Sequence, residues 1–120
     1  MTSILAVDDS PSMRQMVSYA LENAGYEVML ANDGKLALEI AEATRVNLVI
    51  TDVNMPNMDG ITLVKKLRKL PDYRFVPILI LTTESSKEKK MQGKQAGATG
   101  WIVKPFDPDQ LLNTLKRVLD

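Results

Sequence analysis

The sequence contains no cysteine and no histidine among its 120 residues. The lack of cysteine excludes disulfide bonds and thiolate metal sites. The lack of histidine excludes the usual zinc sites and histidine general bases. Any acid chemistry in this protein therefore has to come from carboxylates.

Net charge is absent as well, because 15 Lys and Arg residues balance 15 Asp and Glu residues. This balance does not indicate a nucleic-acid partner. The first ten residues, MTSILAVDDS, contain no basic segment and reach an acidic pair after four apolar residues, so we expect neither a signal peptide nor a membrane span. The length suits one compact domain. We expect a single domain over residues 1–120 of a soluble, cytoplasmic protein.

Five short apolar runs have the length of β-strands: residues 4–7, 26–30, 47–51, 76–82 and 100–103. Between and after them, helical spacing predicts helices at about 11–24, 33–43, 58–70, 85–96 and 108–119. Ser10 and Pro11 have the pattern of an N-cap and first helical residue, Gly25 ends that helix, and Asp107 caps the last one. The first helix carries one apolar stripe, formed by Met13, Met16, Val17, Ala20, Leu21 and Ala24.

Uninterrupted apolar strands that alternate with helices are typical of a parallel sheet covered on both faces. We therefore expect an α/β fold, a doubly wound (βα)5 domain with a five-stranded parallel sheet in which all five strands are buried. In such sheets the ligand site lies beyond the carboxyl ends of the strands, where the winding reverses. Polar residues that follow or end the expected strands are Asp8, Asp9, Asp52, Thr82 and Lys104.

Three carboxylates at neighbouring strand ends would repel one another unless positive charge lies among them. Lys104 supplies one positive charge, which leaves a formal excess of two negative charges. Mg²⁺, which takes carboxylate, water and phosphoryl oxygens as ligands, would balance that excess. Asp52 could then act as a nucleophile toward phosphorus, with charge on the phosphoryl oxygens stabilised by Lys104 and the metal. The sequence predicts a hard-metal site and covalent phosphorylation of Asp52.

These residues, together with the Lys104–Pro105 pair, resemble the receiver domain of bacterial two-component response regulators over the whole chain. More narrowly, the chain is similar to the CheY-like, single-domain chemotaxis regulators of that family. The resemblance implies a flavodoxin-like fold with strand order 2-1-3-4-5 and a cis Lys104–Pro105 peptide bond. It also implies a signalling protein that is no enzyme beyond its self-catalysed phosphotransfer and autodephosphorylation.

The resemblance further implies roles for the site residues and a set of partners. Asp9, Asp52 and the backbone carbonyl of Asn54 would bind Mg²⁺, with Asp8 assisting, while Lys104 and Thr82 would contact the phosphoryl group. A sensor histidine kinase would phosphorylate Asp52. The partners would include a downstream target, such as a flagellar motor switch protein, and a phosphatase. The output would pass through the face formed by the fourth helix, fifth strand and fifth helix of a monomer.

Two further pairs of residues would control the switch. Trp101 stands where the family carries Tyr or Phe, which turns inward as the threonine at the Thr82 position moves toward phosphate. The larger indole would restrict that movement. Asn54 and Glu84 stand two residues beyond Asp52 and Thr82, and they would flank the line along which water attacks the phosphorus. Because both are polar, we expect a short-lived phosphorylated state.

The expected fourth helix, SSKEKKMQGKQA, has few apolar residues, with Met91 and Ala96 as its apolar positions. Gly93 in its interior costs about 1 kcal/mol relative to alanine, so we expect a marginal helix that Gly93→Ala would stabilise. Its four lysines are either a solvated face or a docking surface for an acidic partner.

Three alternatives remain open at this stage. A haloacid dehalogenase-like phosphohydrolase would also use an Asp nucleophile and Mg²⁺, but it requires an aspartate where this chain has Asn54. A flavodoxin-like cofactor carrier would need a Gly- and hydroxyl-rich phosphate loop after the first strand, where this chain has DDSPSM. The chain could also be the receiver domain of a longer response regulator or hybrid kinase.

Overall fold

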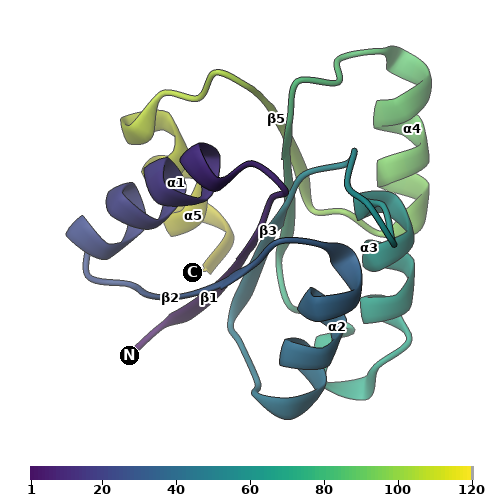
Figure 1. Cartoon of the computed structure of the whole chain (residues 1–120), viewed down its shortest axis with the longest axis horizontal. Coiled ribbons are helices and arrows are strands. Elements are labelled where there is room, and N and C mark those ends of the chain that lie inside the picture. Colours follow the sequence, from purple (N-terminus) through teal and green to yellow (C-terminus); the bar gives the residue numbers. More distant parts are fainter. Residues whose placement is uncertain (120) are drawn as a thin grey trace.

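The computed structural model describes residues 1–119, in which strands and helices alternate along the chain (Figure 1). The strands are β1 (Ser3–Val7), β2 (Glu27–Ala31), β3 (Leu48–Thr51), β4 (Ile78–Thr82) and β5 (Gly100–Val103). The helices are α1 (Pro11–Asn23), α2 (Gly34–Ala43), α3 (Gly60–Arg68), α4 (Lys87–Ala96) and α5 (Pro108–Leu119), with a 3-10 turn, η1 (Pro71–Tyr73), before β4. The predicted α/β alternation is confirmed. Among the described helices, none is long and apolar enough to cross a membrane.

The five strands form one parallel sheet in the order β2-β1-β3-β4-β5. Both the predicted sheet and the strand order implied by the resemblance are confirmed. The chain moves outward from β1 to β2 and then returns to add β3 on the other side of β1. The winding therefore reverses between β1 and β3, and the gap beyond their carboxyl ends is where such folds bind ligands.

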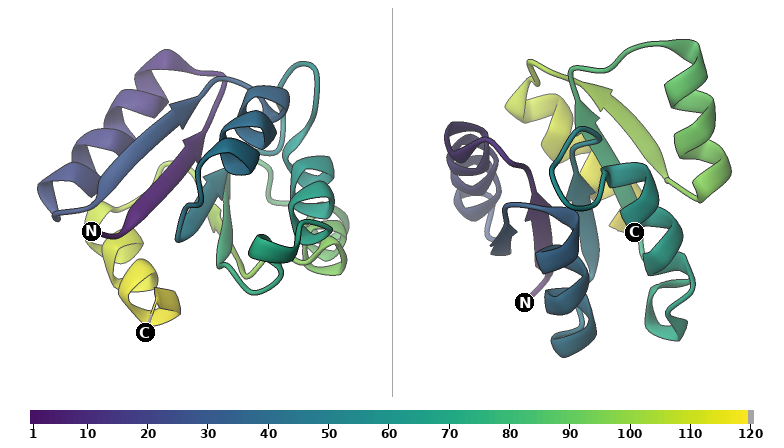
Figure 2. Two further views of the ribbon diagram at one scale, coloured as in Figure 1. Left: turned by 90° about the horizontal axis from the view of Figure 1, so that it is seen from below. Right: turned by 45° about the vertical axis from the view of Figure 1, so that its right-hand side comes forward.

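Helices cover both faces of the sheet: α1 and α5 lie on one face, and α2, α3 and α4 on the other (Figures 1 and 2). Alternate residues of the central strands face the two layers. Leu5 and Val7 belong to the core beneath α2–α4, whereas Ile4 and Ala6 belong to the core beneath α1 and α5. Burying an aliphatic side chain of this size contributes roughly 1.5–3 kcal/mol, so these two cores hold the strand ends in place.

The expectation that all five strands are buried is right for the centre of the sheet and wrong for its edges. Strands β1, β3 and β4 are buried along their whole length. At the two edges, Leu30 in β2 and Val103 in β5 keep 40% and 39% of their surface exposed. The helical layers cover the three middle strands and leave parts of the edge strands open to water.

The ends of the helices follow the local sequence. Ser10 caps α1 by accepting a hydrogen bond from the Met13 amide, with Pro11 as the first helical residue. Asp107 Oδ1 accepts a hydrogen bond from the Asp109 amide at the start of α5. Gly25 has a φ of 93°, a backbone conformation that glycine adopts without strain, just after the end of α1. These three predictions are confirmed.

Two predicted details of the helices are wrong. Helix α3 begins at Gly60 rather than near residue 58, because Asp59 is its N-cap and accepts a hydrogen bond from the Thr62 amide. Met16, which the sequence places on the apolar stripe of α1, is 53% exposed. The buried part of that stripe is narrower and consists of Val17 and Leu21.

Helix α4 differs from the prediction in how it meets the core. Ser86 caps it, and Met91, one of its two apolar positions, is 61% exposed. Gly93 and Ala96 are the buried residues of the helix. A Cβ atom added to Gly93 would lie 2.7 Å from Cζ3 of Trp101, which is closer than such atoms pack. Gly93 therefore allows α4 to pack closely on Trp101, which counts against the expectation that alanine would stabilise this helix.

Candidate functional site

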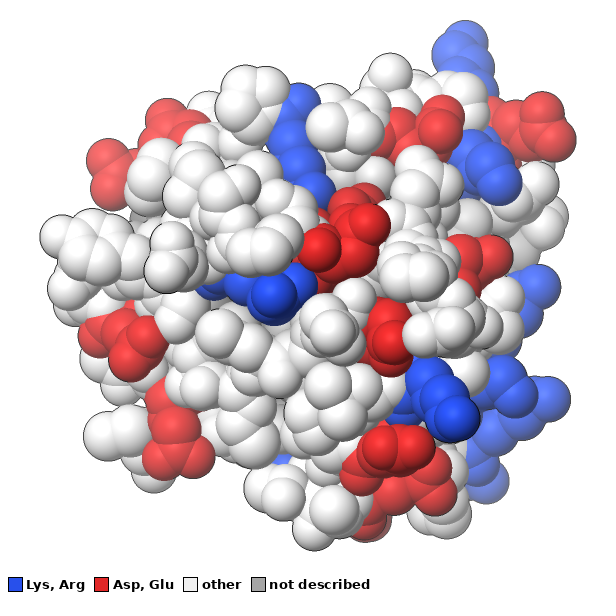
Figure 3. All heavy atoms as spheres, in the orientation of Figure 1, with Lys and Arg blue, Asp and Glu red and all other residues white. Residues whose placement is uncertain are grey.

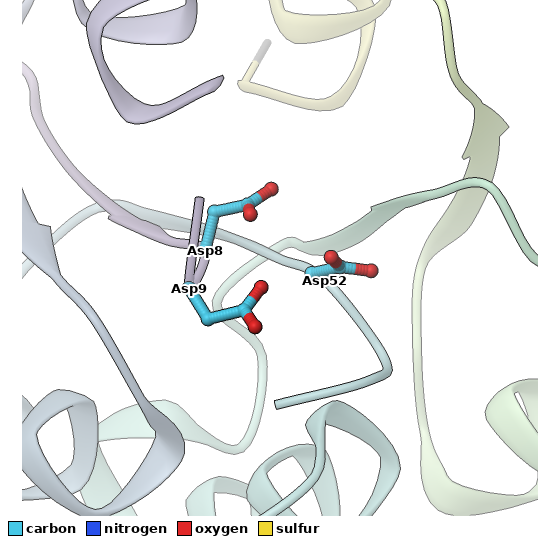
Figure 4. Close-up of side chains that lie close together, drawn as sticks. All are labelled: Asp8, Asp9 and Asp52. Atoms are coloured by element: carbon cyan, nitrogen blue, oxygen red, sulfur yellow. The ribbon is translucent and has the colours of Figure 1, made fainter. Parts of the chain in front are cut away.

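Three aspartates lie close together beyond the ends of β1 and β3 (Figure 4). Asp8 and Asp9 follow β1, and Asp52 follows β3. The strand register pairs Val7 with Thr51, and the Asp52 amide donates a hydrogen bond to the Val7 carbonyl at 3.0 Å. One carboxylate oxygen from each aspartate lies within 4.8 Å of the others. Carboxylate oxygens gathered in this way fit a hard divalent cation.

Two of the three carboxylates are buried, and their backbone contacts fix their orientation. Asp8 and Asp52 are 6% and 8% exposed, whereas Asp9 is exposed. Oδ1 of Asp8 accepts a hydrogen bond from the Ser10 amide at 3.0 Å, and Oδ1 of Asp52 accepts one from the Val53 amide at 2.7 Å. Each Oδ1 is thus held by the backbone, and each Oδ2 is left to contact Lys104.

Lys104 bridges these two buried carboxylates. Its Nζ lies 2.6 Å from Asp8 Oδ2 and 3.1 Å from Asp52 Oδ2. Burial alone would lower the pKa of the Lys104 ammonium, but the hydrogen bonds to Asp8 and Asp52 outweigh it and raise that pKa above its ordinary value. The lysine therefore stays charged. With three carboxylates and one ammonium, the cluster keeps the excess negative charge predicted from the sequence.

The backbone around Lys104 places its side chain beside the aspartates. The Lys104 amide donates a hydrogen bond to the Thr82 carbonyl at 2.8 Å, which continues the pairing of β4 with β5 past the end of the strands. The Lys104–Pro105 peptide bond is cis, as the resemblance implied.

Arg14 is a contact that the sequence analysis missed. Its guanidinium donates a hydrogen bond to the backbone carbonyl of Asp8 at 2.6 Å from the first turns of α1. A second positive charge thus lies beside the β1–α1 loop and helps to fix the main chain of Asp8. Arginine on a helix surface is common, so nothing in the spacing alone marks this residue.

Thr82, Glu84 and Trp101 are linked through the loop that follows β4. Thr82 is fully buried, and its Oγ1 accepts a hydrogen bond from the Glu84 amide at 3.2 Å. The carbonyl of Glu84 in turn accepts a hydrogen bond from Nε1 of Trp101 at 2.9 Å. The predicted switch pair, Thr82 and Trp101, is therefore connected through the backbone of Glu84, although its switching role stays a prediction.

Asn54 and Glu84 were predicted to control hydrolysis. Asn54 is exposed at the start of the β3–α3 loop, and Glu84 is partly buried. The side chain of Glu84 accepts a weak bond from the Ser86 amide at 3.4 Å, while Ser86 itself caps α4. Ser86, and not Glu84, is thus the N-cap of α4, and the tuning role of Asn54 and Glu84 stays a prediction.

The fold and the site together define the class of this protein: a doubly wound α/β domain with a lysine-bridged cluster of carboxylates at its switch point. The chain belongs to the response regulator receiver domain family, which matches residues 4–116. Receiver domains serve two-component signalling, and this assignment sets aside the phosphohydrolase and flavodoxin-like alternatives.

Three known proteins illustrate the range of relatives. The chain is 58% identical to the chemotaxis response regulator CheY4 of Vibrio cholerae, with a TM-score of 0.93 and 98% of each chain covered. It is 38% identical to the alkaline phosphatase synthesis transcriptional regulatory protein PhoP of Bacillus subtilis over 97% of this chain, but it spans only 48% of the length of PhoP. It is 30% identical to the receiver domain of the sensor histidine kinase PA1611 of Pseudomonas aeruginosa PAO1, with a TM-score of 0.92 and coverage of 98% and 97%. That structure holds a magnesium ion in its active site cleft.

Proposed function

We propose that this receiver domain is a phosphorylation switch that accepts a phosphoryl group on Asp52 from a sensor histidine kinase. The observation that carries the proposal is the bridge from Lys104 to buried Asp8 and Asp52, next to the carboxylate of Asp9, in a cluster with more carboxylates than cations. A cluster arranged in this way can hold a divalent cation together with an incoming phosphoryl group. The proposal treats residues 1–120 as one receiver domain.

The donor set fits Mg²⁺, because carboxylate oxygens of Asp8, Asp9 and Asp52 lie close together and the sequence contains neither cysteine nor histidine. Asp9 and Asp52 would hold the ion, together with the backbone carbonyl of Asn54, with Asp8 assisting. The bound ion would supply positive charge to the phosphoryl oxygens. The magnesium ion in the PA1611 receiver supports the proposal.

In the transfer step, a carboxylate oxygen of Asp52 forms a bond to phosphorus as the phosphorus–nitrogen bond of the donor phosphohistidine breaks, and the imidazole leaves with the electron pair. The backbone amide of Val53 holds the Asp52 carboxylate in place. Lys104 is already charged at the same carboxylate and would stay with the phosphoryl oxygens as they arrive. Thr82 would donate its hydroxyl hydrogen to one of those oxygens.

The signal would leave through the α4–β5–α5 face. Residues 60–99, which include α3, β4 and α4, hold nine of the 15 Lys and Arg residues but three of the 15 Asp and Glu residues. Figure 3 shows acidic side chains near the middle of the view and basic ones along its right-hand side, over α3 and α4. This uneven distribution favours a downstream protein with an acidic docking segment.

Chemotaxis is the pathway that the proposal favours, because the 58% identity to CheY4 extends over the whole chain. The downstream partner would then be a flagellar motor switch protein, with a phosphatase to end the signal, and the domain would act in the cytoplasm as a monomer. The second candidate is the receiver half of a longer regulator, which the match to half of PhoP favours.

The proposal is tested with beryllofluoride, a phosphoryl mimic, in the presence of Mg²⁺. Trp101 is the single tryptophan of the chain, so its fluorescence reports on β5 without labelling. We expect a saturable change in the wild type and none in Asp52→Asn, with Asp72→Asn as a control that removes an exposed carboxylate elsewhere. Equal responses of wild type and Asp52→Asn would contradict the proposal.

A further inference from the structure

The loop between β3 and α3 carries the residues that follow Asp52, and its two ends are fixed tightly. At one end, the Val53 amide donates a hydrogen bond to Asp52 Oδ1. At the other end, the Gly60 amide donates one to the Val53 carbonyl at 2.8 Å. A Cβ atom on Gly60 would lie 1.8 Å from the Asp52 carbonyl oxygen, so the start of α3 lies directly against the backbone of Asp52.

The middle of this loop is held from a different part of the chain. Nδ2 of Asn57 donates a hydrogen bond to Oδ2 of Asp33 at 2.7 Å, across 24 residues of sequence. Asn57 has a φ of 68°, a left-handed conformation that asparagine tolerates better than most residues. The loop bends at Asn57, and the side-chain amide of Asn57 faces the neighbouring β2–α2 loop.

The two carboxylate oxygens of Asp33 accept different hydrogen bonds. Its Oδ1 caps α2 by accepting a hydrogen bond from the Leu36 amide at 2.8 Å, and its Oδ2 accepts the bond from Asn57. These two bonds, the Leu36 bond first, lower the pKa of the Asp33 carboxyl below its ordinary value. The carboxylate is therefore charged at neutral pH and fixed at both oxygens.

Close packing beside this bond brings the two loops together. A Cβ atom on Gly34, the first residue of α2, would lie 2.6 Å from the Met58 carbonyl oxygen. The β2–α2 loop is in turn joined to the acidic cluster, because the Asp8 amide donates a hydrogen bond to the Ala31 carbonyl at 3.1 Å. The loop after Asp52 is thus tied, through Asp33, to the end of β2 beside Asp8.

We propose that Asp33 and Asn57 are positioning residues for the metal site: their hydrogen bond fixes the β3–α3 loop so that the backbone carbonyl of Asn54 is held at the acidic cleft. The inference rests on the proposed function, because it takes that carbonyl as a Mg²⁺ ligand. Neither residue touches the ion. Their bond acts by keeping the exposed middle of this loop in the arrangement that the ion would require.

The experiment exploits the complementary chemistry of the two side chains. Asn57→Gly removes the donor and keeps the left-handed backbone accessible. Asp33→Ser keeps a capping oxygen for α2, because serine caps helices about as well as aspartate does, but it removes the second oxygen, which accepts the bond from Asn57. The exchanged pair, Asp33→Asn with Asn57→Asp, restores a donor facing an acceptor and preserves both the net charge and the cap. Glu39→Gln in α2 controls for the loss of one nearby negative charge, and Asp9→Ala marks the metal site.

The dissociation constant for Mg²⁺ is measured for every variant by following amide chemical shifts around the cleft. Each single variant at Asp33 or Asn57 loses the free energy of one hydrogen bond. We therefore expect each of them to raise the dissociation constant for Mg²⁺ about 3- to 10-fold. The exchanged pair should return it to within about twofold of the wild-type value. Amide exchange of residues 53–59 without metal should be faster in both single variants and wild-type-like in the exchanged pair.

The outcomes separate this inference from the proposed function. If Asp9→Ala loses Mg²⁺ while both single variants bind it as the wild type does, the positioning role is overturned and the proposed function stands. Failure of the exchanged pair to recover affinity also overturns the positioning role. If the wild type and Asp9→Ala bind Mg²⁺ equally, the proposed metal site is wrong, and the positioning role is wrong with it.

Discussion

Gly93 of α4 packs directly against the indole ring of Trp101, so that an added Cβ atom would lie 2.7 Å from Cζ3 and 3.0 Å from Cε3. Helix propensity alone would favour alanine by about 1 kcal/mol. Overpacking a close contact costs about 1–3 kcal/mol, and we expect this cost to exceed the gain in helix propensity. Gly93→Ala should therefore lower the free energy of unfolding, measured by urea denaturation, by about 1 kcal/mol.

Two further variants check the cause of that loss. Gln95→Ala, at an exposed position of the same helix, should leave stability nearly unchanged. Trp101→Leu combined with Gly93→Ala should cost less than the sum of the two single changes, because the smaller side chain leaves room for the methyl group. A more stable Gly93→Ala protein would show that propensity decides and that α4 does not pack closely on Trp101.

Removal of Lys104 separates its phosphate-facing role from metal binding. In Lys104→Ala, Asp8 and Asp52 lose their cationic partner, and stability in metal-free buffer with EDTA should fall by roughly 2 kcal/mol. Mg²⁺ should bind at least as tightly as in the wild type, because the cleft becomes more negative, but the response to beryllofluoride should be lost. Lys65→Ala, which removes an exposed lysine of α3, is the control. Weaker Mg²⁺ binding in Lys104→Ala would count against the role given to this residue.

The bond between Asp33 and Asn57 has a pH signature of its own. Because the folded-state pKa of Asp33 is lowered from 3.8, the stability that its bonds provide is fully present above pH 3.8 and is lost as the pH falls through the lower folded-state value. Asn57→Gly should raise the pKa of Asp33 without restoring it to 3.8, because the bond from Leu36 remains. A carboxyl-carbon NMR titration of both proteins measures this, and an unchanged pKa would mean that the Asn57 bond is not formed in solution.

The lifetime of the phosphorylated state should be short. Asn54 and Glu84 are polar residues that can orient a water molecule, so we expect a wild-type lifetime on the order of a minute or less. Asn54→Met and Glu84→Leu should each slow phosphate release by about an order of magnitude, because apolar side chains shield the bond to phosphorus. Thr83→Ala, at a neighbouring exposed position, is the control. Equal rates in all variants, or a wild-type phosphoryl group that lasts for hours, would disprove the fast-cycling prediction.

The sequence was sufficient to predict features that depend on residues close together in the chain. Ser10 with Pro11 marks the start of α1, and the polar residues after apolar runs identify Asp8, Asp52 and Lys104 before their contacts are known. Hydrophobic periodicity and helix propensity do not reveal which distant residue a side chain contacts in the folded protein. In the sequence, Gly93 appears only as a residue that destabilises a helix. The structure shows that it packs against Trp101.

The same limit explains what the sequence analysis missed at the site. Arg14 reaches a carbonyl six residues earlier, and Asn57 reaches a carboxylate 24 residues earlier. Both are residue types that are common on protein surfaces, and neither stands at a strand end. Loops meet according to how the helices pack on the sheet, so contacts such as Asp33 with Asn57 become visible only in three dimensions.

The central claim is that Asp52 accepts a phosphoryl group in a Mg²⁺-dependent reaction, and intact-protein mass spectrometry tests it most directly. The wild type and Asp52→Asn are incubated with acetyl phosphate, with Mg²⁺ or with EDTA, and each mass is recorded within seconds of mixing. We expect the added mass of one phosphoryl group in the wild type with Mg²⁺, and none in EDTA or in Asp52→Asn. The same added mass in Asp52→Asn, or no added mass in the wild type with Mg²⁺, would contradict this claim.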